Sequence, residues 1–103
     1  MTEHSMPQPI GAVGPGYVRV TAFEMLAMSI RMKTHNVSQV AVFMDRTGAV
    51  YALDEGSRDA QLLSRRWPHW LVGVYTIAAN RQQIAGDLRE RHREAMRKKA
   101  KAA

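Results

Sequence analysis

The side chains that could perform metal or acid-base chemistry are few and scattered in this sequence. The four histidines, at positions 4, 35, 69 and 92, include no pair three or four residues apart, the spacing that lets two imidazoles on one helix bind the same metal ion. The chain contains no cysteine, so it can form neither a thiolate zinc cluster nor a disulfide framework. We therefore expect no metal site and no cofactor.

Carboxylates are the remaining candidates for catalysis. Asp45, Asp54, Glu55 and Asp59 lie close together in the sequence, and paired carboxylates can hydrolyse a substrate or hold the metal ion of a nuclease. A turn and a helix start also favour short acidic side chains, which explains Asp45 and Asp59 without catalysis. A non-catalytic protein is the main prediction, and a small hydrolase or nuclease stays as the less favoured alternative.

Positive charge is concentrated at the C-terminal end. The formal net charge is +6, and residues 81–103 carry eight Lys or Arg and three acids, whereas residues 1–80 carry seven and six. On a helix, positions 89, 93 and 97 form a row with steps of about 6 Å, comparable to the separation of phosphates along a nucleic-acid strand. The candidate nucleic-acid-binding residues are Arg89, Arg93, Arg97, Lys98, Lys99 and Lys101.

The same basic segment could instead only increase solubility. Asp87 can pair with Arg91 and Glu94 with Lys98 at i, i+4 spacing, which would neutralise part of the charge. Basic helices without further nucleic-acid motifs are common. Contact with nucleic acid or another polyanion and a plain solubilising tail therefore both remain open.

A helix over residues 22–34 would carry apolar side chains on two opposite sides, because successive residues advance by about 100°. One stripe consists of Phe23, Leu26, Ala27 and Ile30, and the other, called the Met stripe below, consists of Met25, Met28 and Met32. Two apolar sides need two covers. The first cover is the sheet, and the second is the C-terminal helix, a second subunit or a partner protein. Methionine is adaptable and recurs on binding surfaces, but apolar helical spacing is also typical of a core.

The segment Trp67-Pro-His-Trp70 brings two indoles together around a proline. Such a pair could stack on a base or another ligand, or it could close a hydrophobic core where a strand begins. Together with the Met stripe, Trp67 and Trp70 are the candidate partner-binding residues.

Hydrophobic periodicity and turn residues predict an α+β fold: a small antiparallel sheet of three or four strands with helices packed on it. The predicted strands cover residues 17–20, 40–44, 49–53 and 70–78, and the predicted helices cover residues 22–34, 58–66 and 81–99. Strand 70–78 is apolar on both faces, which favours a place near the sheet centre. The order of elements matches the ferredoxin-like βαββαβ arrangement with an added C-terminal helix.

The chain divides into a flexible N-terminal arm (1–16), an α+β core (17–80) and a basic C-terminal helix and tail (81–103). Residues 1–16 lack the basic start and apolar stretch of a secretory signal. No apolar run approaches the roughly 18 residues of a membrane helix. We expect a cytoplasmic protein without membrane contact.

These patterns predict a non-catalytic macromolecular interaction module. We expect it to associate with itself, for instance as a homodimer, and to contact nucleic acid or another polyanion through its basic helix. The alternative is a small inhibitor or adaptor that binds a single protein partner through the Met stripe and the two tryptophans.

Overall fold

The computed structural model describes residues 7–12 and 20–102 of the chain. Its elements, in chain order, are β1 (Gly11–Ala12), α1 (Val20–Thr34), β2 (Gln39–Met44), β3 (Ala49–Asp54), α2 (Arg58–Arg66), the short 3-10 helix η1 (Pro68–Trp70), β4 (Leu71–Thr76) and α3 (Arg81–Ala102). The strands form one antiparallel sheet in the order β1-β3-β2-β4. The predicted α+β class is confirmed.

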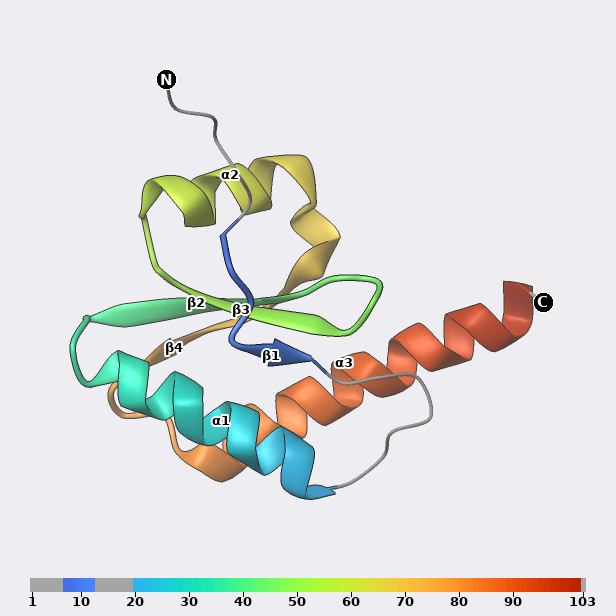
Figure 1. Cartoon of the computed structure of the whole chain (residues 1–103), viewed down its shortest axis with the longest axis horizontal. Helices are drawn as coiled ribbons and strands as arrows, with labels where there is room; N and C mark the ends of the chain where they lie inside the picture. Colours follow the sequence, from blue (N-terminus) through green and yellow to red (C-terminus); the bar gives the residue numbers. More distant parts are fainter. Residues whose placement is uncertain (1–6, 13–19, 103) are drawn as a thin grey trace.

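The molecule has three layers, with the sheet in the middle (Figure 1). Helices α1 and α3 pack together against one face, and α2 lies over the other. Strand residues alternate between these faces, as the pleat requires: Val40 and Val42 point to the α1–α3 side, whereas Ala41 and Phe43 point to the α2 side. None of the helices in the described ranges is long and apolar enough to span a bilayer.

The ferredoxin-like topology is wrong, although the order of elements along the chain matches it. In that fold the last strand lies beside the first and both helices cover one face. Here β4 lies beside β2, at the opposite edge from β1. The connection β1-α1-β2 joins two parallel strands, and so does the connection β3-α2-β4. Both connections lead across the sheet towards the β4 edge, but β1 and β2 run in the opposite direction to β3 and β4. Right-handed crossovers then place α1 and α2 on opposite faces.

One strand prediction lies mostly outside the described residues, and another is wrong. Of the strand expected at residues 17–20 only Val20 is described, as the first residue of α1; within the described residues the first strand is Gly11–Ala12, paired with Ala49 and Val50. Strand β4 is at the sheet edge rather than near its centre. Its apolar residues misled the prediction because several of them are exposed, namely Leu71 and Val74, with Ile77 just after the strand.

The β2–β3 hairpin forms as predicted, and the Asp45 side chain holds its turn. Oδ1 of Asp45 accepts hydrogen bonds from the backbone N–H groups of Thr47 (2.8 Å) and Ala49 (3.0 Å) and from the Thr47 hydroxyl (2.6 Å). Oδ2 accepts from the Tyr51 hydroxyl at 3.0 Å. Gly48 has φ 93°, a conformation that glycine adopts without strain. This carboxylate therefore has a structural role.

The main core forms between α1, α3 and the sheet. Phe23 and Ile30 of α1 and Ile84 and Leu88 of α3 are fully buried there. The start of α3 is capped, because Oδ1 of Asn80 accepts a hydrogen bond from the Gln83 N–H at 2.7 Å. The first half of α3 is thus part of the core.

A hydrogen bond ties α3 to the edge strand. The buried Tyr75 hydroxyl of β4 donates to Oδ2 of Asp87 at 2.7 Å. Burial, and then the bond to this carboxylate, raise the pKa of Tyr75 above its ordinary value. Burial and a similar bond to Asp45 raise the pKa of Tyr51. Both phenols therefore keep their protons more tightly in the folded chain.

The raised pKa values of Tyr75 and Tyr51 in the folded chain predict a loss of stability in alkali. Tyrosines of the unfolded chain ionise near pH 10, so the stabilisation is complete below about pH 10 and is lost as the pH rises above it. Tyr75→Phe should lower the free energy of unfolding by about 1 kcal/mol at pH 7 and make it fall less steeply above pH 10. Urea unfolding at both pH values measures this. Asp87→Asn, which keeps an acceptor, is the control; an unchanged alkaline slope in Tyr75→Phe would contradict the assignment.

Candidate functional site

The predicted arginine row lies on the continuous helix α3, but its members differ in their surroundings. Arg89 is half-buried, with its guanidinium carbon 6.0 Å from the centre of the Phe23 ring, and its Nε is buried without a hydrogen-bond partner among the described residues. Arg93 donates to Glu90 at 3.1 Å, and both side chains are more than half exposed. Arg97 is exposed. The row therefore offers two exposed guanidinium groups and one packed into the protein.

The three lysines of the predicted set continue the helix. Lys98 is exposed. Lys99 and Lys101 belong to α3 by their backbone, and their side chains lie outside the described part. The C-terminal turns of α3 extend away from the sheet (Figure 1). This end of the helix carries the highest density of positive charge in the chain.

The prediction that Asp87 pairs with Arg91 and Glu94 with Lys98 on α3 is wrong. Among the side chains that the structure describes, only two ion pairs form, Lys33–Asp54 at 3.5 Å and Arg93–Glu90 at 3.1 Å. Asp87 is turned to Tyr75 instead of Arg91. The acids of α3 therefore cancel less of its charge by direct contact than the sequence indicates.

A groove runs between the second half of α3 and the tip of the β2–β3 hairpin; we call it the hairpin groove. Its volume is about 1040 Å³, and three segments line it: residues 44–47 of the hairpin, residues 68–71 around η1, and the side of α3 that carries Arg91, Ala95 and Lys98. Arg46 is exposed at the tip of the hairpin. The groove thus brings together cations from two segments that are distant in the sequence.

Arg46 and Arg91 were not among the predicted site residues. Arg91 and Lys98 are seven residues apart, which is two helical turns, so they share a side of α3. By the same geometry Arg93 points to a nearly opposite side of the helix. The spacing of Arg91 and Lys98 was visible in the sequence, but the approach of Arg46 depends on how α3 packs and was not.

The two tryptophans close the smaller core under α2. The rings of Trp67 and Trp70 are stacked, with centroids 4.3 Å apart and an interplanar angle of 6°, and Tyr51 lies parallel to Trp70 at 6.2 Å. Both indoles are half-buried against a cluster that contains Leu63 and Phe43. Their first role is therefore structural, although Trp70 also lines the hairpin groove.

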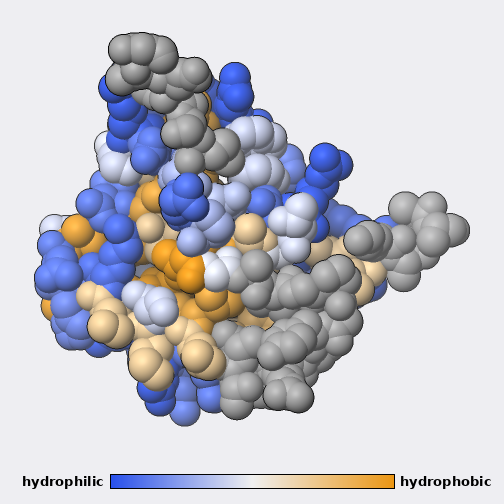
Figure 2. Space-filling model, viewed as in Figure 1, coloured by the Kyte–Doolittle hydropathy of each residue, from blue (hydrophilic) through white to orange (hydrophobic). Residues whose placement is uncertain are grey.

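The Met stripe is exposed, whereas the opposite stripe of α1 forms core. Relative exposure is 67% for Met25, 44% for Met28 and 64% for Met32. Helix α3 packs against the Phe23 side of α1 and leaves the Met stripe uncovered. The space-filling view shows pale orange side chains protruding over the position of α1 (Figure 2). Within the single chain, the Met stripe is a surface.

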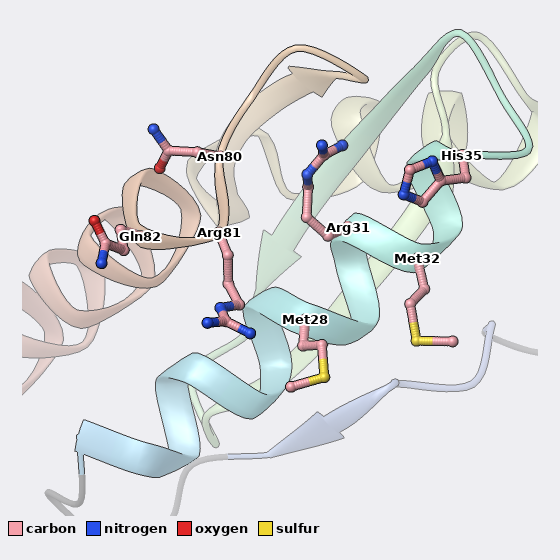
Figure 3. A pocket seen from close by; sticks show the side chains of 7 residues that line it. All are labelled: Met28, Arg31, Met32, His35, Asn80, Arg81 and Gln82. Atoms are coloured by element: carbon pink, nitrogen blue, oxygen red, sulfur yellow. The ribbon is translucent and has the colours of Figure 1, made fainter.

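A second hollow of about 480 Å³ adjoins this stripe (Figure 3). Arg81 extends from the start of α3 towards α1, and Arg31 lies beside Met28 and Met32 on α1. One guanidinium nitrogen of Arg31 donates to the Thr34 hydroxyl at 3.3 Å. The Met stripe and the tryptophans lie in different layers of the molecule, so the structure does not bring the predicted partner-binding residues together.

Two of the four candidate catalytic carboxylates are engaged in contacts within the fold. Asp45 holds the hairpin turn, and Asp54 pairs with Lys33. The described residues contain no group of three His, Asp or Glu side chains placed to hold a metal ion. His92 is buried with its ring 5.8 Å from that of Phe23, as a core histidine would be.

Comparison with known proteins gives no match: no family model, no curated protein and no solved structure matches this chain.

The exposure of the Met stripe predicts that it contributes little to the stability of one chain. Replacing Met25, Met28 and Met32 together by Gln should change the free energy of unfolding by about 1.5 kcal/mol or less, because isolated surface changes cost about 0.5 kcal/mol each at most. Ile30→Ala, on the buried side of the same helix, should cost about 2–5 kcal/mol. Urea unfolding at low protein concentration compares them, and a large loss in the Met variant would make the stripe part of the core.

Proposed function

We propose that this protein is a non-catalytic interaction module that binds a polyanion, in particular a nucleic-acid backbone, through α3 and associates with a second copy through the Met stripe. The observation that supports polyanion binding is the imbalance on α3. Its exposed cations include Arg97 and Lys98, and among the described side chains its acids form only one ion pair on the helix, Glu90 with Arg93.

Contacts of this kind act on phosphates and not on bases. Exposed guanidinium and ammonium groups on a helix position the protein along a backbone without selecting a sequence. Binding then releases counterions from the nucleic acid, so the affinity falls steeply as the salt concentration rises. Because the body of the chain is nearly neutral, the binding surface is confined to one end of the molecule.

A charge-matched pair of variants tests this proposal. Replacing Arg93, Arg97 and Lys98 by Gln removes three positive charges from α3, and replacing Arg58, Arg65 and Arg66 by Gln removes three from α2. The α3 variant should bind a fluorescent DNA duplex of about 20 base pairs about tenfold or more weakly, and its plot of log affinity against log salt should be less steep by about 3. Fluorescence anisotropy at several salt concentrations measures both quantities.

The α2 variant should bind almost as tightly as the unaltered chain. Equal losses in the two variants would mean that net charge alone attracts DNA. An affinity that does not change with salt would contradict backbone contact altogether.

Self-association is supported by the exposed Met stripe. Three methionines spaced along one side of α1 give an apolar strip, which the described residues leave exposed. Two copies related by a twofold axis can place α1 against α1, so that each strip covers the other. Methionine suits such a contact because its unbranched side chain adapts to the facing surface.

Analytical ultracentrifugation over a range of concentrations tests this association. The unaltered chain should form a dimer, and the triple Met-to-Gln variant should remain a monomer because it lacks the apolar strip. Val74→Lys, on the exposed part of edge strand β4, is the control and should still form dimers. If the Val74 variant alone is monomeric, the copies meet at the sheet edge. If the unaltered chain is a monomer, the stripe is left for a different protein, as in an inhibitor or adaptor.

A further inference from the structure

We infer that the hairpin groove binds nucleotides of a single-stranded nucleic acid, with a base held against its apolar part and the adjoining phosphates held by Arg46, Arg91 and Lys98. This inference rests on the proposed polyanion binding and names the class of polyanion.

The size of the groove fits an extended ligand with a bulky planar group. Its volume of about 1040 Å³ is at the upper end of the range for small-molecule sites, about 300–1000 Å³. Helix α3, which forms one side of the groove, continues beyond Lys98 to Ala102. A chain of nucleotides can therefore place one base in the groove and continue along the basic helix.

The lining has the apolar and aromatic character that a base requires. Leu71 is 38% exposed, and Trp70 next to it is half-buried. The imidazole of His69 is exposed and meets the Trp70 ring edge-on at 6.4 Å. Stacking on aromatic side chains, including histidine, is the usual way in which proteins hold an unpaired base.

The charges around the groove favour an anion. Arg46 comes from the hairpin, and Arg91 and Lys98 come from α3. Asp45 is also in the lining, so three cations stand against two acids there, and both oxygens of the Asp45 carboxylate accept hydrogen bonds within the hairpin. Glu94 is the other acid there, and neither it nor the three cations form an ion pair among the described side chains.

The combination of an apolar lining with flanking cations favours a single strand over a duplex. In a duplex the faces of the bases are stacked on one another, so only phosphates, sugars and base edges can reach the protein. An apolar wall with an exposed imidazole would then contact charged backbone and contribute nothing. An unpaired base has an open face for this wall while its phosphates contact the flanking cations.

The test compares three labelled probes: a single strand of about ten thymidine nucleotides, an abasic strand of the same length and charge, and a duplex of that length. The full chain should bind the thymidine strand about tenfold tighter than the abasic strand in fluorescence anisotropy, because stacking adds to the shared phosphate contacts. The double variant His69→Ala, Leu71→Ser should lose this preference and keep its affinity for the abasic strand.

A matched control makes the same two changes elsewhere in the molecule. His35→Ala combined with Val74→Ser alters an exposed histidine and an exposed apolar residue outside the groove, and it should keep the tenfold preference. Circular dichroism verifies that both variants are folded.

The outcomes separate this inference from the proposed function. Equal affinity of the full chain for the thymidine and abasic strands would overturn base binding while leaving polyanion binding intact. A preference that survives the His69 and Leu71 changes would place the base elsewhere and overturn the groove assignment. Loss of salt-dependent binding to every probe would instead contradict the proposed function.

Discussion

The packing of the first half of α3 against α1 and the sheet determines both the hairpin groove and the exposure of the Met stripe. Ile84 and Leu88 are fully buried beside Phe23 and Ile30, and the Tyr75–Asp87 hydrogen bond fixes the helix to the edge strand. A helix held this firmly over two turns can leave the core in only one direction. Its second half therefore passes the hairpin tip and forms the groove. Because α3 covers the Phe23 side of α1, the same packing leaves the Met stripe exposed.

Local hydrogen bonds then decide which charges remain available. The carboxylates of Asp45 and Asp87 each accept a tyrosine hydroxyl, and Asp45 also holds three donors of its turn. Both acids lie near arginines that they could have paired with, Arg46 and Arg91. Their bonds to uncharged donors leave those guanidinium groups without an acid partner among the described side chains. The positive character of α3 and the groove thus depends on which groups the acidic side chains contact as much as on the number of basic residues.

Much of the fold could be predicted from the sequence because its signals are local. The apolar runs of the two hairpin strands and the Asp45-to-Gly48 turn each act within a few residues. Strand β1 has only two residues and no pattern of its own. Strand order, the edge position of β4 and the presence of Arg46 and Arg91 in one groove depend on contacts between distant segments, which a single sequence does not contain.

The two proposed interactions reinforce each other physically. A dimer that forms through α1 carries two α3 helices, so one particle presents two basic ends and two grooves. When one end is bound to a nucleic-acid strand, the other end is confined near the same strand, and its effective concentration there exceeds that of a free molecule. The contacts at the two ends, each weak and salt-sensitive by itself, then bind the strand jointly. A chain of this size can in this way combine a modest charge on each copy with firm binding, provided that the Met stripe brings two copies into one particle.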